Sequence, residues 1–339
     1  MAKESLAVKY RPRSFEDLTE QGAIKDILEN QIKTKTFQHG YLFTGPAGTG
    51  KTTSARIFAS MINDGKGNPI EVDAASNSGV DNIRQIIEDA KRKPLDAEYK
   101  IFIVDECHSL SNGAWQALLK TLEEPPKFTI FIFCTTDPQK VPATILSRVQ
   151  RYNFQKISNE GIEDRLHQII KGELPVGGYV DPVSIAYIAK VSSGGMRDAI
   201  TLLDKCLSLS HDLTLENVLK TIGAEDYNTF ITFLSALTEK EKEISIKVIE
   251  DVYNAGKDVK QFMKDFARFI LDVEKYALYG NFDYVNLPNT LESNLEQLNS
   301  VDLFSVMDFV VSLNNQIKWD NDPKTLIELS ILIYCEKEN

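Results

Sequence analysis

The run GYLFTGPAGTGKT, residues 40–52, constrains the fold more than any other stretch of this chain. An apolar, strand-like segment leads directly into a glycine-rich loop, and a helix-like segment begins at Lys51. The loop has the pattern G-x-x-x-x-G-K-[ST], and in this strand–loop–helix context the pattern indicates a phosphate-binding loop. The sequence therefore predicts an α/β nucleotide-binding domain around this loop.

The residue types of the loop fit a bound nucleotide. Glycines let backbone amides curl around phosphate without side-chain clashes, and the following helix directs its positive end at the same anion. We expect Lys51 to neutralise the β- and γ-phosphate oxygens and Thr52 to ligate Mg²⁺. The predicted loop contacts are Gly45, Pro46, Ala47, Gly48, Thr49, Gly50, Lys51, Thr52 and Thr53.

Alternation of strand-like and helical segments from about residue 21 to 155 predicts a mainly parallel sheet covered by helices. Runs that are apolar at nearly every position are typical of strands buried on both faces. These runs are residues 40–45, 69–73, 100–106 and 129–136. Helix-like segments lie between them at residues 51–63, 78–93 and 111–124, and a shorter strand-like run follows Arg148.

The run KIFIVDE ends in Asp105 and Glu106, at the sheet edge where the phosphate loop is expected. There Asp105 can hold Mg²⁺ through water, and Glu106 can orient or deprotonate the attacking water. Alone, such an acidic pair is as often a helix N-cap. Thr136 ends the next buried strand, where a hydroxyl could hold the attacking water or serve only in the turn.

From residue 158 onward the apolar spacing is that of helices. The predicted domains are an α/β domain over residues 1–157, a small helical domain over 158–212 and a larger helical domain over 213–339. In the last domain, residues 243–280 are helical by periodicity, and 281–289 are turn-like.

Composition narrows the setting of the protein. No apolar run approaches the ~18 residues that span a bilayer, and the start MAKESLAVKYRPRSF has no signal core, so we expect a cytoplasmic protein without membrane contact. The four cysteines are scattered, which predicts neither a disulfide framework nor a zinc module. The net charge of −11 argues against a surface that is basic throughout, so any DNA contact must come from a local patch or an assembled interior.

Seven blocks in order resemble the gamma/tau ATPase subunit of bacterial clamp loaders, a member of the AAA+ class. They are VKYRPRSFEDL, GYLFTGPAGTGKTT, VDAAS, VDECHSLS, ALLKTLEEPP, TTDPQKVPATILSR and GGMRDAITLLDK. The resemblance covers residues 5 to 212, and beyond them DPKTLIELSILIY resembles the family's helical collar. It implies an AAA+ domain, a small helical lid and a collar through which a homo- or hetero-pentamer forms.

The resemblance also implies roles for individual residues. Val8, Tyr10, Arg11 and Pro12 would lie against the adenine of ATP, although Tyr10 and Pro12 could equally be packing residues. Thr136 corresponds to the family's sensor 1, and Arg197 to sensor 2, which reaches the γ-phosphate from the lid of the same subunit. Arg148 matches the arginine of a Ser-Arg-Cys motif that reaches ATP on the adjacent subunit. The predicted catalytic set is Lys51, Asp105, Glu106, Thr136, Arg148 and Arg197.

Three departures from the family stand out. Val149 replaces the motif's cysteine, where we expect a packing role. Between Ser60 and Ile70 the sequence has no four-cysteine module, so no zinc is expected. The chain also ends after the collar, without a tau-type tail. These departures predict a divergent member, from a bacterial cell or, if phage-encoded, from the cytoplasm of the host.

Contacts to macromolecules are implied by the resemblance alone. Arg84 and Lys120 match positions that touch the template backbone of primer-template DNA, although either is otherwise an ordinary solvated helix charge. The helix and loop over residues 80–100 would face the sliding clamp.

The leading hypothesis is a clamp-loader subunit that uses ATP and Mg²⁺ to open a sliding clamp and place it on primed DNA. One alternative is another AAA+ DNA motor resembling a branch-migration helicase. The other is a non-hydrolysing scaffold subunit of the loader, which Lys51, Thr52, Asp105 and Glu106 argue against because a scaffold does not need them.

Overall fold

The computed structural model describes residues 4–174, 178–222, 226–282, 284–288, 291–298 and 303–336. The chain forms two compact units, Met1–Val218 and Leu219–Asn339. The boundary between them lies close to the predicted start of the larger helical domain. The finer division of the first unit at residue 157 stays a prediction.

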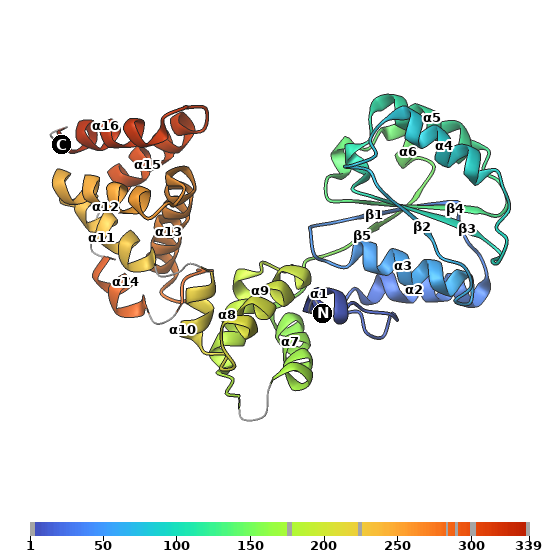
Figure 1. The fold of residues 1–339 in the computed structure, drawn as a ribbon, viewed down its shortest axis with the longest axis horizontal. Helices are drawn as coiled ribbons and strands as arrows, with labels where there is room; N and C mark the ends of the chain where they lie inside the picture. Colours follow the sequence, from blue (N-terminus) through green and yellow to red (C-terminus); the bar gives the residue numbers. More distant parts are fainter. Residues whose placement is uncertain are drawn as a thin grey trace. The chain divides into compact units, whose positions relative to one another are not determined.

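The first unit is built on a five-stranded sheet in which every pair of neighbouring strands is parallel (Figure 1). Its strand order is β2-β3-β4-β1-β5, which confirms the predicted parallel α/β fold. The strands are β1 (Gly40–Thr44), β2 (Ile70–Asp73), β3 (Lys100–Asp105), β4 (Thr129–Thr135) and β5 (Gln150–Asn153).

The central strands are buried on both faces because helices cover the sheet on each side. Helices α2 (Gly22–Thr34) and α3 (Lys51–Ile62) lie on one face (Figure 1). On the other face lie α4 (Val80–Ala90), α5 (Asn112–Glu123) and α6 (Ala143–Leu146). A hydrophobic core lies on each face of the sheet, and alternate residues of β1 contribute to the two cores. Tyr41 and Phe43 pack on the α2–α3 side, and Leu42 packs on the other.

Residues 70–73 form a strand as predicted, but the prediction that both its faces are buried is wrong. Only Val72 of β2 is buried, because β2 lies at the edge of the sheet. Its Glu71 points to the α3 side and pairs with Arg56. At the opposite edge, β5 occupies the strand-like run after Arg148, and Tyr152 is its buried residue.

One short helix, α1, and three longer helices complete the first unit. The helices are α1 (Leu6–Lys9), α7 (Asn159–Glu173), α8 (Pro182–Val191) and α9 (Met196–Leu209), and α10 (Leu215–Thr221) follows at the unit boundary. Serine caps start two of the elements: Ser111 Oγ accepts the N–H of Ala114 in α5, and Ser158 Oγ accepts the N–H of Gly161 in α7. Single-turn helices η1 (Cys107–Ser109) and η2 (Pro138–Lys140) follow β3 and β4.

In the described residues of the second unit, the regular secondary structure is helical. Its helices are α11 (Asp226–Thr238), α12 (Lys242–Asn254), α13 (Val259–Tyr279), α14 (Glu292–Leu298), α15 (Phe304–Ile317) and α16 (Pro323–Glu336). The helical segment predicted over 243–280 is interrupted, since Gly256 has φ +74° and Asp258 caps α13 through the N–H of Lys260. The described residues of the predicted turn at 281–289 lie between α13 and α14; residues 283 and 289 lie outside the described part.

None of the helices in the described part of the chain combines the length and the apolar character that a membrane span requires.

Candidate nucleotide site

The phosphate-binding loop leaves the carboxyl end of β1 and enters α3 at Lys51, as the sequence predicts. Gly45 and Gly48 have φ of +143° and +73°, which side chains rarely tolerate. A Cβ on Gly45 would lie 2.4 Å from the carbonyl oxygen of Phe154, and one on Gly48 would lie 2.9 Å from Cα of Gly195. The loop is therefore held tightly between the end of β5 and the start of α9.

Lys51 is buried inside the curl of the loop. Its Nζ donates hydrogen bonds to the carbonyl oxygens of Gly45 (2.8 Å) and Pro46 (2.7 Å). Burial lowers the pKa of Lys51, while the negative charges of Glu106 and Asp105 act in the opposite direction. A short movement of this ammonium group would exchange two carbonyl partners for phosphate oxygens.

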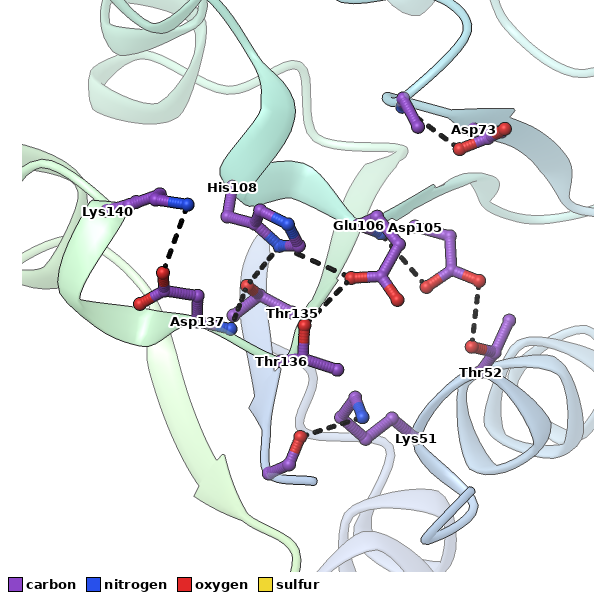
Figure 2. Close-up of polar contacts among 12 residues, drawn as sticks. Lys51, Thr52, Asp73, Asp105, Glu106, His108, Thr135, Thr136, Asp137 and Lys140 are labelled. Atoms are coloured by element: carbon purple, nitrogen blue, oxygen red, sulfur yellow. Dashed lines mark hydrogen bonds and ion pairs between the residues drawn. The ribbon is translucent and has the colours of Figure 1, made fainter. Parts of the chain in front are cut away.

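Thr52 and Asp105 form an oxygen pair beside the loop. Thr52 Oγ1 donates to Asp105 Oδ2 over 2.9 Å, joining the first turn of α3 to the end of β3 (Figure 2). Hydroxyl and carboxylate oxygens are the hard donors that Mg²⁺ prefers, and Mg²⁺ keeps several waters when few protein ligands are present. The pair thus fits a Mg²⁺ ion that also contacts phosphate.

No group of three or more histidine, cysteine or acidic side chains in the described residues is arranged to hold a metal ion. All four cysteines are free thiols. The expected absence of zinc stays a prediction.

Glu106 follows β3 in a left-handed conformation, with φ +47°. Its Oε2 lies 3.2 Å from Thr136 Oγ1, a hydroxyl at the end of the neighbouring strand β4, and 3.2 Å from His108 Nδ1 (Figure 2). The structure thus brings together Glu106 and Thr136, which the sequence predicted separately.

Lys51, Thr52, Asp105 and Glu106 line a cleft of about 500 Å³ in the first unit. This volume is within the range of small-molecule sites. The predicted residues that line it are Tyr10, Arg11, Pro12, residues 47–53, Asp105, Glu106 and Arg197. Four other residues predicted for this site are not among the lining residues: Val8, which is 49% exposed, Gly45, Pro46 and Thr136.

The lining also includes residues that sequence reasoning did not name. They are Ala7, Leu18, Thr19, Arg56, Ile157, Arg165, Met196, Asp198 and Ile200. Helical periodicity could have found Arg56, because it lies one turn beyond Thr52 on the same face of α3. The apolar members carry no such signal, since nothing in the sequence distinguishes them from core residues.

Helix α9 closes one side of the cleft. The N–H of Met196 donates to the carbonyl oxygen of Gly48 over 3.1 Å, so the first turn of α9 is bonded to the phosphate loop itself. Arg197 is the next residue and lies on the cleft wall. A helix N-terminus and an arginine side chain both favour an anion at this position.

The N-terminal strap, residues 5–12, crosses the cleft and is tied to the helices after β5. The N–H of Leu6 donates to Asp204 of α9 over 2.9 Å. The Tyr10 hydroxyl donates to Glu173 of α7 over 2.7 Å, and Arg165 of α7 donates to the Tyr10 carbonyl oxygen over 2.9 Å. The hydrogen bond to Glu173, and then burial, raise the pKa of Tyr10. Tyr10 therefore both packs against α7 and lines the cleft.

Arg148 lies away from this cleft. It precedes β5, at the amino-terminal ends of the strands, whereas the phosphate loop follows β1 at their carboxyl ends. The five residues of β1 separate these two ends of the sheet by about 15 Å. Arg148 Nη2 is 2.5 Å from Glu123 Oε1, and Val149 beside it packs against the core, in agreement with the expected packing role.

Arg84 and Lys120 are exposed on the neighbouring helices α4 and α5. Arg84 pairs with Asp81 over 3.1 Å, a contact between exposed groups that contributes little. A role for either residue in binding DNA stays a prediction.

Known proteins share both the sequence and the fold of this chain. A family model described as "DNA polymerase III, delta subunit" matches residues 68–158. The tau subunit of DNA polymerase III from Bacillus subtilis is 35% identical over 99% of this chain and 64% of its own length. The gamma/tau subunit of Mycoplasma genitalium is 34% identical over 86% of this chain and 52% of its own length. The chain thus spans about half to two thirds of the length of these relatives.

Among solved structures, the RuvB Holliday junction branch migration motor of Thermotoga maritima matches with a TM-score of 0.52. That match has 19% identity and covers 68% of this chain and 80% of RuvB. A point mutant of the same RuvB matches with a TM-score of 0.53 and 17% identity, over 84% of this chain and 91% of that one. At these identities the likeness shows the AAA+ fold alone. The sequence matches are much stronger, and by them the chain belongs to the gamma/tau family of DNA polymerase III subunits.

Proposed function

We propose that this chain is the ATPase subunit of a sliding-clamp loader in DNA replication. The observation that carries the proposal is the meeting of Lys51, Thr52, Asp105 and Glu106 at one sheet edge, in a chain related to gamma/tau subunits. A scaffold subunit without turnover would have no need of this set. Other loader subunits, the clamp and primed DNA are the partners that this function requires.

In the proposed reaction, the amides of the phosphate loop and the ammonium group of Lys51 hold the phosphates of ATP. Thr52 and Asp105 would hold Mg²⁺, which when bound neutralises charge on the β- and γ-phosphates. Glu106 orients a water molecule for in-line attack and accepts its proton. Thr136 donates a hydrogen bond to the same carboxylate. Arg197 stabilises the γ-phosphate from α9.

ATP binding and hydrolysis would act on the clamp by closing and opening the assembly of subunits. Binding of ATP would hold α9 and the strap against the cleft, since Met196 bonds α9 to the phosphate loop and Tyr10 bonds the strap to α7. Arg148 cannot reach the cleft of its own subunit, so it would complete the site of a neighbour. Hydrolysis would then release the closed assembly from clamp and DNA.

ATP turnover tests this function. We expect turnover by the assembled loader to rise several-fold when a sliding clamp and primed DNA are both present, because they stabilise the closed state. The matched control is duplex DNA without a primer junction. Equal turnover with and without both partners would contradict the proposal, and strand separation by the chain alone would favour a branch-migration motor.

A further inference from the structure

His108 has no part in the function proposed above, yet it lies against Glu106. We infer that His108 is a positioning residue that holds the Glu106 carboxylate in place for hydrolysis; this rests on the proposed function. Its imidazole comes from η1, three residues beyond the end of β3, and faces the same side of the sheet edge as Glu106 and Thr136 (Figure 2).

The contacts of the imidazole identify Nδ1 as the ring nitrogen that faces Glu106. Nδ1 lies 3.2 Å from Glu106 Oε2 and 3.0 Å from Thr135 Oγ1. A carboxylate only accepts hydrogen bonds, so an attractive contact requires the proton on Nδ1. The single Nδ1–H therefore donates to Thr135 Oγ1 and lies within ion-pair distance of the carboxylate, while Thr136 donates to the same Oε2.

The imidazole is itself anchored to rigid parts of the fold. Thr135 is fully buried at the end of β4, and its Oγ1 also accepts the N–H of Asp137 over 3.0 Å. The backbone of η1 is closed by the N–H of Ser109, which donates to the carbonyl oxygen of Glu106 over 2.9 Å. His108 thus joins a fixed point on β4 to a carboxylate whose other side-chain contact is the hydrogen bond from Thr136.

Glu106 needs such support more than most carboxylates. Its backbone has the left-handed conformation, and its side chain is 40% exposed, so packing holds it less firmly than a buried carboxylate. A base must stay within hydrogen-bond reach of the attacking water. Loss of the second donor lets the carboxylate leave this position without affecting how the loop and Lys51 hold the nucleotide.

The test compares His108→Phe, which keeps an aromatic ring, with His108→Asn, whose amide N–H can replace Nδ1–H. In the assembled loader we expect His108→Phe to lower kcat for ATP about 10-fold, with ATP affinity and KM within about twofold of wild type. His108→Asn should recover kcat to within about threefold of wild type. The control is His211→Ala at an exposed histidine, which should behave as wild type.

A second arm uses Glu106→Gln. If His108 acts through Glu106, adding His108→Phe to Glu106→Gln should lower the residual turnover by less than about twofold. Independent effects of about 10-fold in both backgrounds would overturn the inference. So would a His108→Phe variant with wild-type kcat, an Asn variant no better than Phe, or a parallel loss of ATP affinity. No turnover by the wild-type assembled loader, even with clamp and primed DNA, would instead remove the proposed function, and the inference with it.

Discussion

At the scale of single residues, the account depends most on the pair formed by Thr52 and Asp105. Asp105→Asn keeps the size of the side chain but removes the charge that attracts Mg²⁺. We expect ATP turnover to fall at least ~100-fold, and Mg²⁺ to lose most of its effect on nucleotide affinity. Titration of a fluorescent ATP analogue with and without Mg²⁺ measures this.

Two further variants sharpen that prediction. Thr52→Val should act in the same direction, and the double variant should be no worse than Asp105→Asn alone, because both residues serve one ion. Asp26→Asn on the exposed face of α2 is the control and should match wild type. Wild-type Mg²⁺ dependence in Asp105→Asn would contradict the assignment.

Tyr152 on β5 makes a prediction about alkaline pH. Burial raises its pKa to about 12, while the hydrogen bond from Gln31 acts in the opposite direction. The unfolded tyrosine has a pKa of about 10, so the folded protein holds this proton more tightly. The resulting stability is fully present below pH ~10 and is lost as the pH rises through ~12.

Denaturant unfolding of wild type and Tyr152→Phe at several pH values measures this loss. Relative to the variant, the wild type should lose on the order of 2 kcal/mol of unfolding free energy across that window. Burial raises the pKa of Tyr41, the other buried tyrosine of this core, above this window, so its ionisation adds little to the comparison. A difference that stays constant from pH 8 to 12 would show that Tyr152 does not carry the effect.

At the scale of elements, the contact between the strap and α7 can be tested at Gly172. A Cβ at this position would lie 2.6 Å from the Tyr10 hydroxyl oxygen. Alanine in a helix is usually favourable by roughly 0.5–1 kcal/mol, but here it should push the strap away from the cleft. We expect Gly172→Ala to weaken ATP binding several-fold in a calorimetric titration.

Removing the hydroxyl provides the rescue. In the double variant with Tyr10→Phe, ATP affinity should return to that of Tyr10→Phe alone, because the clash is gone. Gly22→Ala, whose Cβ would meet nothing within 4 Å, is the control for the change in helix propensity. Unchanged ATP affinity in Gly172→Ala would show that the strap does not shape the site.

The elements also show how far sequence reasoning reaches. Strands β1, β3 and β4 were predictable because both their faces are buried, which leaves a continuous apolar run. The one-sided burial of β2 could also have been predicted, since IEVD alternates apolar and acidic residues, which is the pattern of a half-buried strand. Glu106 and Thr136 were each predicted at a strand end, but the third partner, His108, depends on how η1 turns after β3, which no local pattern specifies.

At the scale of the whole molecule, the central claim is that the nucleotide site is shared between copies or related subunits. Arg148 and the phosphate loop lie at opposite ends of the parallel strands. One subunit therefore has the arginine at one end of its sheet and the cleft at the other. Neighbours that repeat this arrangement would each complete the next site. Turnover should therefore depend on assembly.

Mixing two inactive variants measures this directly. Arg148→Ala subunits keep a complete cleft, and Lys51→Ala subunits keep the arginine; each alone should lose nearly all turnover. Mixed in equal amounts, random neighbours should restore up to about a quarter of wild-type turnover, with the arginine supplied in trans. Light scattering on the mixture controls for assembly. Turnover no greater than the sum of the two variants, in assemblies shown to contain both, would contradict a shared site.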